Sequence, residues 1–175
     1  QTCALPIYGV QAVQLITRAM GDAGVSANDY SKVLDSMARA SQVSGISIDK
    51  LAENVTKYGA PMRSLGFEMK ESISLFSQWE KAGVNTEIAF SGLKKAISNW
   101  GAAGKNPRVE FKKTLDQIKK APDISTATSL AIKAFGAKAG PDLADAIKQG
   151  RFSIEDMNKA LKTSSGTVDK TFKST

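Results

Sequence analysis

The sequence contains no histidine and a single cysteine, Cys3, and this scarcity excludes several kinds of site. Without histidine there is no imidazole to serve as the base of a Ser-His-Asp triad or as a zinc ligand. One cysteine cannot supply a disulfide framework or a cysteine-rich metal site. The residues most often used for acid–base chemistry, nucleophilic attack and metal binding are therefore missing together.

Long apolar runs and phosphate-binding motifs are also absent. No segment approaches the roughly 18 consecutive apolar residues of a membrane-spanning helix. No glycine-rich phosphate loop or dinucleotide fingerprint occurs. Two carboxylate pairs, Glu68 with Glu71 and Glu80 with Glu87, could serve a glycosidase-like mechanism. Glu68 and Glu71 are three residues apart, however, a spacing typical of a solvated helix face. We predict that the chain is not an enzyme and expect no cofactor or metal.

Apolar residues recur every three or four positions along almost the whole chain, the spacing that favours amphipathic α-helices. No segment alternates apolar and polar residues for long enough to indicate a strand. Trp79 and Trp100 lie on such apolar stripes, which favours core packing over base stacking. The pattern predicts an all-α fold, a compact bundle of about eight or nine short helices.

Four chain corners share one order of residues, in which glycine is followed by an apolar residue and then by serine or asparagine. They are Gly24-Val25-Ser26, Gly45-Ile46-Ser47, Gly83-Val84-Asn85 and Gly150-Arg151-Phe152-Ser153. We expect left-handed glycines, Gly45 and Gly83 among them, to end helices, and the polar residue to cap the next one. Prolines at Pro61, Pro122 and Gly140-Pro141 are expected to end or break helices.

The net charge of +7 is concentrated between residues 105 and 120. This stretch holds Lys105, Arg108, Lys112, Lys113, Lys119 and Lys120 against only Glu110 and Asp116. A basic excess of this kind is typical of a solvated face, and it also makes these six residues the candidate partner-binding site. The alternative is a nucleic-acid-binding helical domain that uses the basic helix 105–120 against phosphates.

The first seven residues, QTCALPI, do not fit the helical pattern and resemble the translation of a widely used sequencing adapter. We interpret Gln1 to Ile7 as an adapter-derived scar that is not native. The flexible linker Gly104-Lys105-Asn106-Pro107 divides the remainder. We therefore expect a first helical subdomain over 8–104 and a second over 105–175.

Several packing motifs resemble those of the core domain of phage tail tape measure proteins. The matching stretches are Ser47 to Glu53, Tyr58 to Pro61, Ser64 to Gly66, Leu75 to Gly83, Ala89 to Ala96, Phe135 to Ile147 and Ser164 to Phe172. The resemblance implies a structural virion protein that acts in tail assembly and tail-length determination. It also implies that this chain is a fragment, and that the second subdomain leads into missing C-terminal sequence.

The same resemblance implies the location and the partners of the protein. It would be made and assembled in the bacterial host cytoplasm and would reside in the phage tail. Its partners would be other tape measure copies, tail assembly chaperones, and tail tube or baseplate proteins. Neither a small-molecule substrate nor a membrane span is expected, and nucleic acid is the less favoured partner.

Because Gln1 to Ile7 has no part in the helical pattern, we predict that deleting it leaves the thermal midpoint of unfolding unchanged. Differential scanning calorimetry of the full and shortened chains measures this. A fall of several degrees, which corresponds to about 1 kcal/mol in a domain of this size, would show that the segment packs and is native.

Overall fold

The computed structural model of the chain describes residues 10–64, 66–153 and 155–156, and within them it is all-α, as predicted. The helices are α1 (Val10–Asp22), the short 3-10 helix η1 (Ala27–Asp29), α2 (Tyr30–Ser44), α3 (Ile48–Ser64), α4 (Met69–Lys81), α5 (Thr86–Ala102), α6 (Pro107–Lys120) and α7 (Ile124–Lys148). The proposed scar, Gln1 to Ile7, lies outside the described residues and stays a prediction. So does the motif from Ser164 to Phe172.

The expected number of eight or nine helices is wrong for the described residues, which form seven α-helices and η1. Pro122 does separate α6 from α7. Pro61, by contrast, lies inside α3, which continues to Ser64 and does not end near Tyr58 to Ala60, and Pro141 lies inside α7. A proline removes one hydrogen bond from a helix. In α3 the next residue, Met62, is completely buried, and this packing holds the last turn in place.

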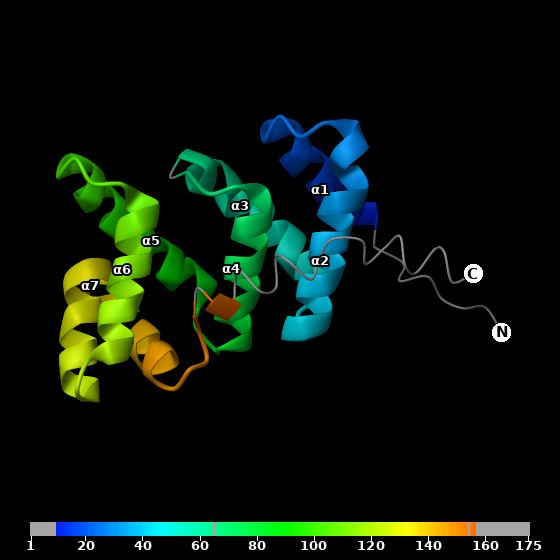
Figure 1. Cartoon of the computed structure of the whole chain (residues 1–175). Coiled ribbons are helices and arrows are strands. Elements are labelled where there is room, and N and C mark those ends of the chain that lie inside the picture. The colour runs from blue at the N-terminus through cyan, green and yellow to red at the C-terminus, as the bar shows by residue number, and fades with distance from the viewer. Residues whose placement is uncertain (1–9, 65, 154, 157–175) are drawn as a thin grey trace.

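The helices lie side by side, and several of the main contacts join helices that are two apart in the chain (Figure 1). α1 packs against α3 and α2 against α4, while α5 and α6 both pack against α7. One continuous hydrophobic core contains residues from all seven α-helices. The predicted boundary at residues 104 and 105 falls between α5 and α6, and the division into two subdomains stays a prediction.

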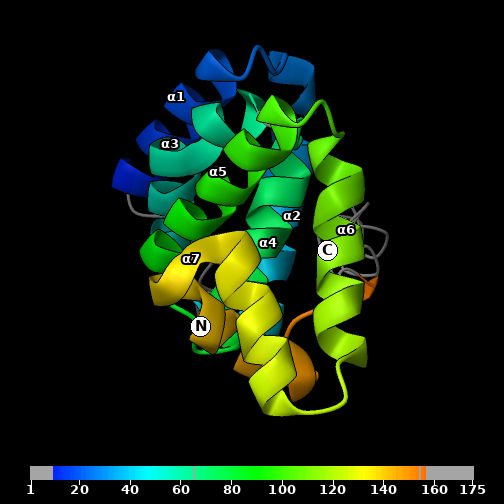
Figure 2. The same ribbon diagram turned by 90° about the vertical axis from the view of Figure 1, so that its left-hand side faces the viewer.

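Helix α7 bends sharply at Gly136, where the chain changes direction (Figure 2). Gly136 has φ 89° and ψ 169°, a conformation that is essentially restricted to glycine. The two halves of α7 then pack closely, because a Cβ atom on Gly140 would lie 2.7 Å from the Cα atom of Ile132. The bend therefore gives α7 two faces, one toward α5 and one toward α6.

The glycine corners have the predicted geometry. Gly45 and Gly83 both have φ 75°, in the left-handed region. After Gly83, the buried Val84 donates its backbone N–H to the carbonyl oxygen of Trp79 at 2.8 Å, which closes the end of α4. The Asn85 side chain then accepts a hydrogen bond at 3.0 Å from the backbone N–H three residues later. One corner thus ends α4 and begins α5.

The predicted cap is wrong at one corner and confirmed at two others. Ser26 makes no side-chain hydrogen bond to the backbone of the helix that follows it, and its hydroxyl instead donates to Asp29 at 3.4 Å. Ser47 and Ser153 each accept a bond from the backbone N–H three residues later, at 3.2 and 3.0 Å. The difference arises because Ser26 precedes a short 3-10 helix.

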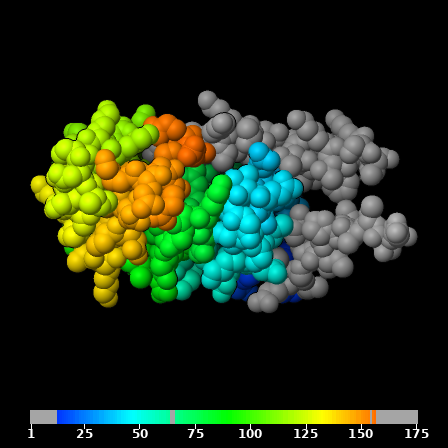
Figure 3. All heavy atoms as spheres, turned by 90° about the horizontal axis from the view of Figure 1, so that it is seen from below, coloured from blue at the N-terminus to red at the C-terminus, as the bar shows by residue number. Residues whose placement is uncertain are grey.

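Helix α4 lies at the centre of the molecule, and all its residues from Glu71 to Ser77 are buried. The segment after α7 covers one end of it. There the ring of the buried Phe152 lies 6.2 Å from that of Trp79, and Arg151 donates to the carbonyl oxygen of Ala82. Figure 3 shows this orange segment lying over the green helices. Helices α2, α3 and α5, together with the segment after α7, thus enclose α4.

Helices α5 and α7 approach closely at Gly92, where a Cβ atom would lie 2.6 Å from that of Ala139 and 2.7 Å from the carbonyl oxygen of Phe135. We predict that Gly92→Ala lowers the free energy of unfolding by about 2 kcal/mol through overpacking. Chemical denaturation measures the change.

Gly101 provides the matched control, because it lies in the same helix and a Cβ atom there would meet nothing within 4 Å. Gly101→Ala should leave the free energy of unfolding unchanged or raise it by up to about 1 kcal/mol. Equal effects of the two substitutions would contradict the close approach of α5 and α7.

Candidate functional site

Helix α6 presents the predicted basic residues because its start and its buried face are both fixed. The Asn106 side chain accepts hydrogen bonds from the backbone N–H groups of Arg108 and Val109, at 3.0 and 3.2 Å. Pro107 occupies the first turn, where its missing N–H costs nothing. Phe111, Leu115 and Ile118 are buried on one face. The other faces of α6 therefore carry the charged residues.

The six predicted residues do not form one cluster. Lys112, Lys113 and Lys120 line a common groove between α6 and α7, whereas Lys105 and Lys119 are exposed and do not line it. Lys105 precedes α6, and its backbone N–H bonds to the carbonyl oxygen of Trp100. The carbonyl oxygen of Lys119 accepts a hydrogen bond from the Lys148 ammonium at 3.2 Å. The structure thus brings three of the six together.

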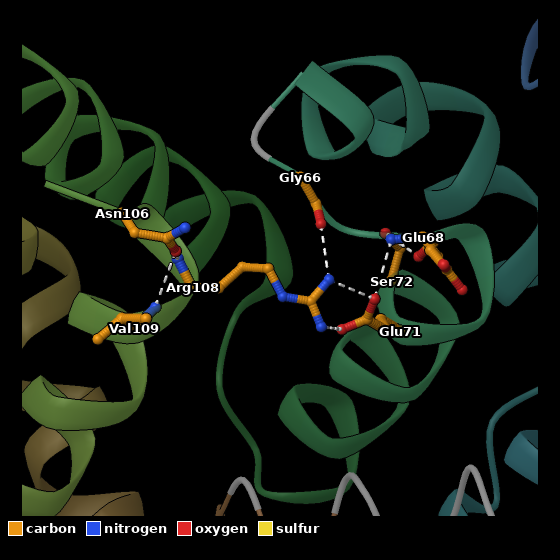
Figure 4. Close-up of polar contacts among 7 residues, drawn as sticks. All are labelled: Gly66, Glu68, Glu71, Ser72, Asn106, Arg108 and Val109. Carbon is orange, nitrogen blue, oxygen red and sulfur yellow. Dashed lines mark hydrogen bonds and ion pairs between the residues drawn. The ribbon is translucent and has the colours of Figure 1, made fainter.

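The sixth residue, Arg108, is hydrogen-bonded to other residues of the same chain (Figure 4). Its guanidinium donates to the two carboxylate oxygens of Glu71 at 2.9 and 2.5 Å, and to the carbonyl oxygen of Gly66 at 2.8 Å. It also lies 5.6 Å from the centre of the Phe67 ring. A bidentate pair of this kind is strong and directional. Arg108 therefore joins α6 to α4 and to the corner before it.

Glu71 was interpreted from its spacing to Glu68 as part of a solvated face, and that interpretation is wrong. Its side chain is only 11% exposed, while that of Arg108 is 50% exposed. Glu71 also accepts a hydrogen bond at 3.2 Å from the backbone N–H of Glu68, the reciprocal half of a capping box. That local pattern was the available signal for its role. The partner of Glu71, Arg108, lies 37 residues away, and no local sequence pattern indicates that the two side chains pair.

The groove between α6 and α7 combines an apolar floor with a basic rim. Val109, half-buried Leu130, Ala121 and Pro122 supply the apolar surface, and Val109 is 61% exposed. The charged lining residues are the lysines Lys112, Lys113, Lys120 and Lys133 with the single acid Asp116. A surface of this composition suits an acidic partner that also carries apolar side chains.

Asp123 caps the first turn of α7, next to Pro122 in the groove wall. The backbone N–H of Thr126 donates to its carboxylate at 2.7 Å. This bond, the Thr126 hydroxyl and the positive charge of Lys148 hold the pKa of the Asp123 carboxyl below its usual value. The cap is therefore ionised at neutral pH and helps to fix the start of α7 beside α6.

The other carboxylate pair named from the sequence, Glu80 and Glu87, has separate partners. Glu80 accepts a hydrogen bond from the Thr86 hydroxyl at 2.6 Å, so it supports the start of α5. Glu87 lies 3.9 Å from the Lys57 ammonium on the surface. Among the described residues there is no group of three or more His, Cys, Asp or Glu side chains placed to hold a metal ion. None of the described helices combines the length and apolar character that a membrane crossing needs.

Residues 9–173 match the model of a protein family described as "Phage-related minor tail protein". The matched range contains all seven α-helices, the Arg108–Glu71 pair and the groove. No curated protein and no solved structure matches the chain.

The Arg108–Glu71 pair generates a stability prediction. Arg108→Ala would leave a buried carboxylate without its main partner, so we predict a loss of about 2 kcal/mol in the free energy of unfolding. Lys112→Ala on the same helix should change it by less than about 0.5 kcal/mol. Urea denaturation of both variants measures the difference.

A double-mutant cycle measures the interaction energy between Arg108 and Glu71. Glu71→Gln should cost less in the Arg108→Ala background than in the original protein, because it then removes an unpaired charge. Additive effects of the two substitutions would show that the two side chains do not interact.

Proposed function

The chain belongs to the phage-related minor tail protein family, and we propose that it is the core domain of a tail tape measure protein. That full protein acts in tail assembly and in tail-length determination. The observation that carries the proposal is the family match over residues 9–173. The tape measure motifs from Ser47 to Glu53, Ala89 to Ala96 and Phe135 to Ile147 lie within that range and support the finer assignment.

Membership in this family supports a structural role in the phage tail. The motifs shared with tape measure proteins have packing roles here. Gly92, in the stretch from Ala89 to Ala96, meets Ala139, in the stretch from Phe135 to Ile147, at the crossing of α5 and α7. We therefore propose that these motifs build a fold that carries a docking surface.

The proposed partners are other tape measure copies, tail assembly chaperones, and tail tube or baseplate proteins. The groove between α6 and α7 supports a docking role, because three lysines of α6 and Lys133 of α7 gather beside exposed apolar surface. Arg108 supports it indirectly by fixing α6 on α4. Lys105 and Lys119, which are exposed outside the groove, would add long-range attraction to an acidic partner.

A length gauge has to be extended, and the described helices are not. They turn back at left-handed glycines such as Gly45, Gly83 and Gly104 and share one hydrophobic core. As one continuous helix, residues 8–153 would span roughly 220 Å at about 1.5 Å per residue. We propose that this domain docks and folds within the assembling tail, and that other sequence in the full protein sets the length.

Duplicating residues 8–153 in frame in the phage gene tests whether this domain contributes to the tail length. We predict tails of unchanged length, produced in equal or smaller numbers, because a folded domain adds no ruler length. Negative-stain electron microscopy of purified particles measures the lengths. Tails longer by roughly 220 Å would show that this segment is itself part of the ruler.

Location in the tail is tested separately on the same particles. Antibodies against the domain, or mass spectrometry of purified tails, should detect its peptides. A chain that is absent both from tails and from tail-assembly intermediates would overturn the proposed function.

A further inference from the structure

We propose that the groove between α6 and the first half of α7 (residues 124–135) binds an acidic amphipathic helix of a partner protein. The inference rests on the proposed function in one respect, namely that the domain docks on another protein. It goes further by naming the surface and the chemistry of the segment that occupies it.

The first support is the shape of the groove. On α6 the lining residues are Val109, Lys112, Lys113, Asp116, Gln117 and Lys120, which recur at helical spacing and therefore form one face. On α7 the lining residues Thr126, Leu130 and Lys133 likewise share a face. The lined part of α6 spans about 16 Å at about 1.5 Å per residue. A helix of about three turns has the matching length.

The second support is exposed apolar surface that no described residue covers. Val109 is 61% exposed, more than any other large hydrophobic residue described in the structure. It lies one turn from Lys112 and Lys113 on the same face, and Leu130 from α7 is half-buried beside the groove. Apolar side chains of an incoming helix would bury this floor in the manner of other helix-in-groove complexes.

The third support is charge. Lys112, Lys113, Lys120 and Lys133 surround the floor with only Asp116 of opposite sign. No salt bridge links any of these four lysines to another described residue. Carboxylates of a partner would therefore meet unpaired ammonium groups, which favours association and excludes basic segments.

Two other occupants fit less well. Residues 157–175 of this chain carry Lys159, Lys162, Lys170 and Lys173 against the single acid Asp169, so their charge has the same sign as the rim. A nucleic acid would use the lysines but would leave Val109 and Leu130 uncovered. Moreover Arg108, which has the side-chain geometry best suited to phosphate, is bonded to Glu71.

The test uses the whole 175-residue chain and a fluorescein-labelled synthetic peptide of about four helical turns. The peptide carries leucines at i, i+3, i+4 and i+7 and glutamates on its other faces. A control peptide has the same composition with its leucines shuffled so that no apolar face forms. Fluorescence anisotropy at physiological salt should show binding of the first peptide in the micromolar range and binding at least about tenfold weaker of the second.

Matched variants locate the site. Val109→Ser should weaken binding about tenfold, since it removes apolar contact. Val43→Ser should have no effect, because Val43 is also an exposed helical valine but lies on α2, away from α6 and α7 (Figure 1). The double charge reversal Lys112→Glu with Lys113→Glu should abolish binding. Unchanged thermal midpoints show that the variants are folded.

Several outcomes would overturn the proposal. These are no binding of the amphipathic peptide, equal binding of the shuffled peptide, or equal effects of Val109→Ser and Val43→Ser. Tight binding of a DNA duplex of about 20 base pairs that depends on Lys112 and Lys113 but not on Val109 would assign the groove to nucleic acid instead. Self-association through the groove, seen by sedimentation and lost in Val109→Ser, would assign it to a second copy.

Failure of this inference is distinguishable from failure of the proposed function. The peptide measurements do not depend on the chain being present in tails. Conversely, detection of the chain in purified tails does not depend on what the groove binds. A chain found in tails whose groove binds no acidic helix would overturn only the present inference.

Discussion

A nearly buried carboxylate constrains much of this structure. Glu71 lies within α4, the helix that the rest of the molecule surrounds, and a charge in that position must be paired to be tolerated. Arg108 supplies the pair from α6 through two hydrogen bonds. Because Asn106 caps the same turn of α6, the start of that helix has little freedom in position or orientation. The face of α6 that carries Lys112 and Lys113 is set by the same contacts.

Aromatic packing also joins the first four α-helices to the last three. The rings of Tyr58 in α3 and Phe90 in α5 lie 4.5 Å apart, and those of Phe67 and Phe111 lie 5.9 Å apart. The Phe111 ring in turn packs edge-on against Phe135 in α7. The polar pair specifies where α6 sits, while these apolar contacts supply most of the burial. Both are needed to place the groove.

The parts of the fold that could be predicted from the sequence are those that local chemistry decides. A left-handed glycine followed by an apolar residue acts within one turn, so Gly45 and Gly83 were identified correctly. Pro61 failed as a helix end because the burial of Met62, a tertiary effect, outweighs one lost hydrogen bond. Arg108 belongs to a basic stretch of the sequence, but its pairing with Glu71, 37 residues away, depends on how α6 packs on α4 and could not be predicted. The groove could not be predicted either, since it needs the packing of α6 on α7.

The position of Phe152 determines when the domain can finish folding during its synthesis. Most helix contacts join elements that are close in sequence, so the early helices can pair while later residues are still being synthesised. Trp79 acquires its ring contact with Phe152 only after the whole of α7 has been made, and Arg151 reaches back 69 residues to Ala82. Until then the nascent chain lacks the cover over one end of its central helix. The core is therefore complete only when residues 151 and 152 can pack on α4, which is after all seven α-helices have been synthesised.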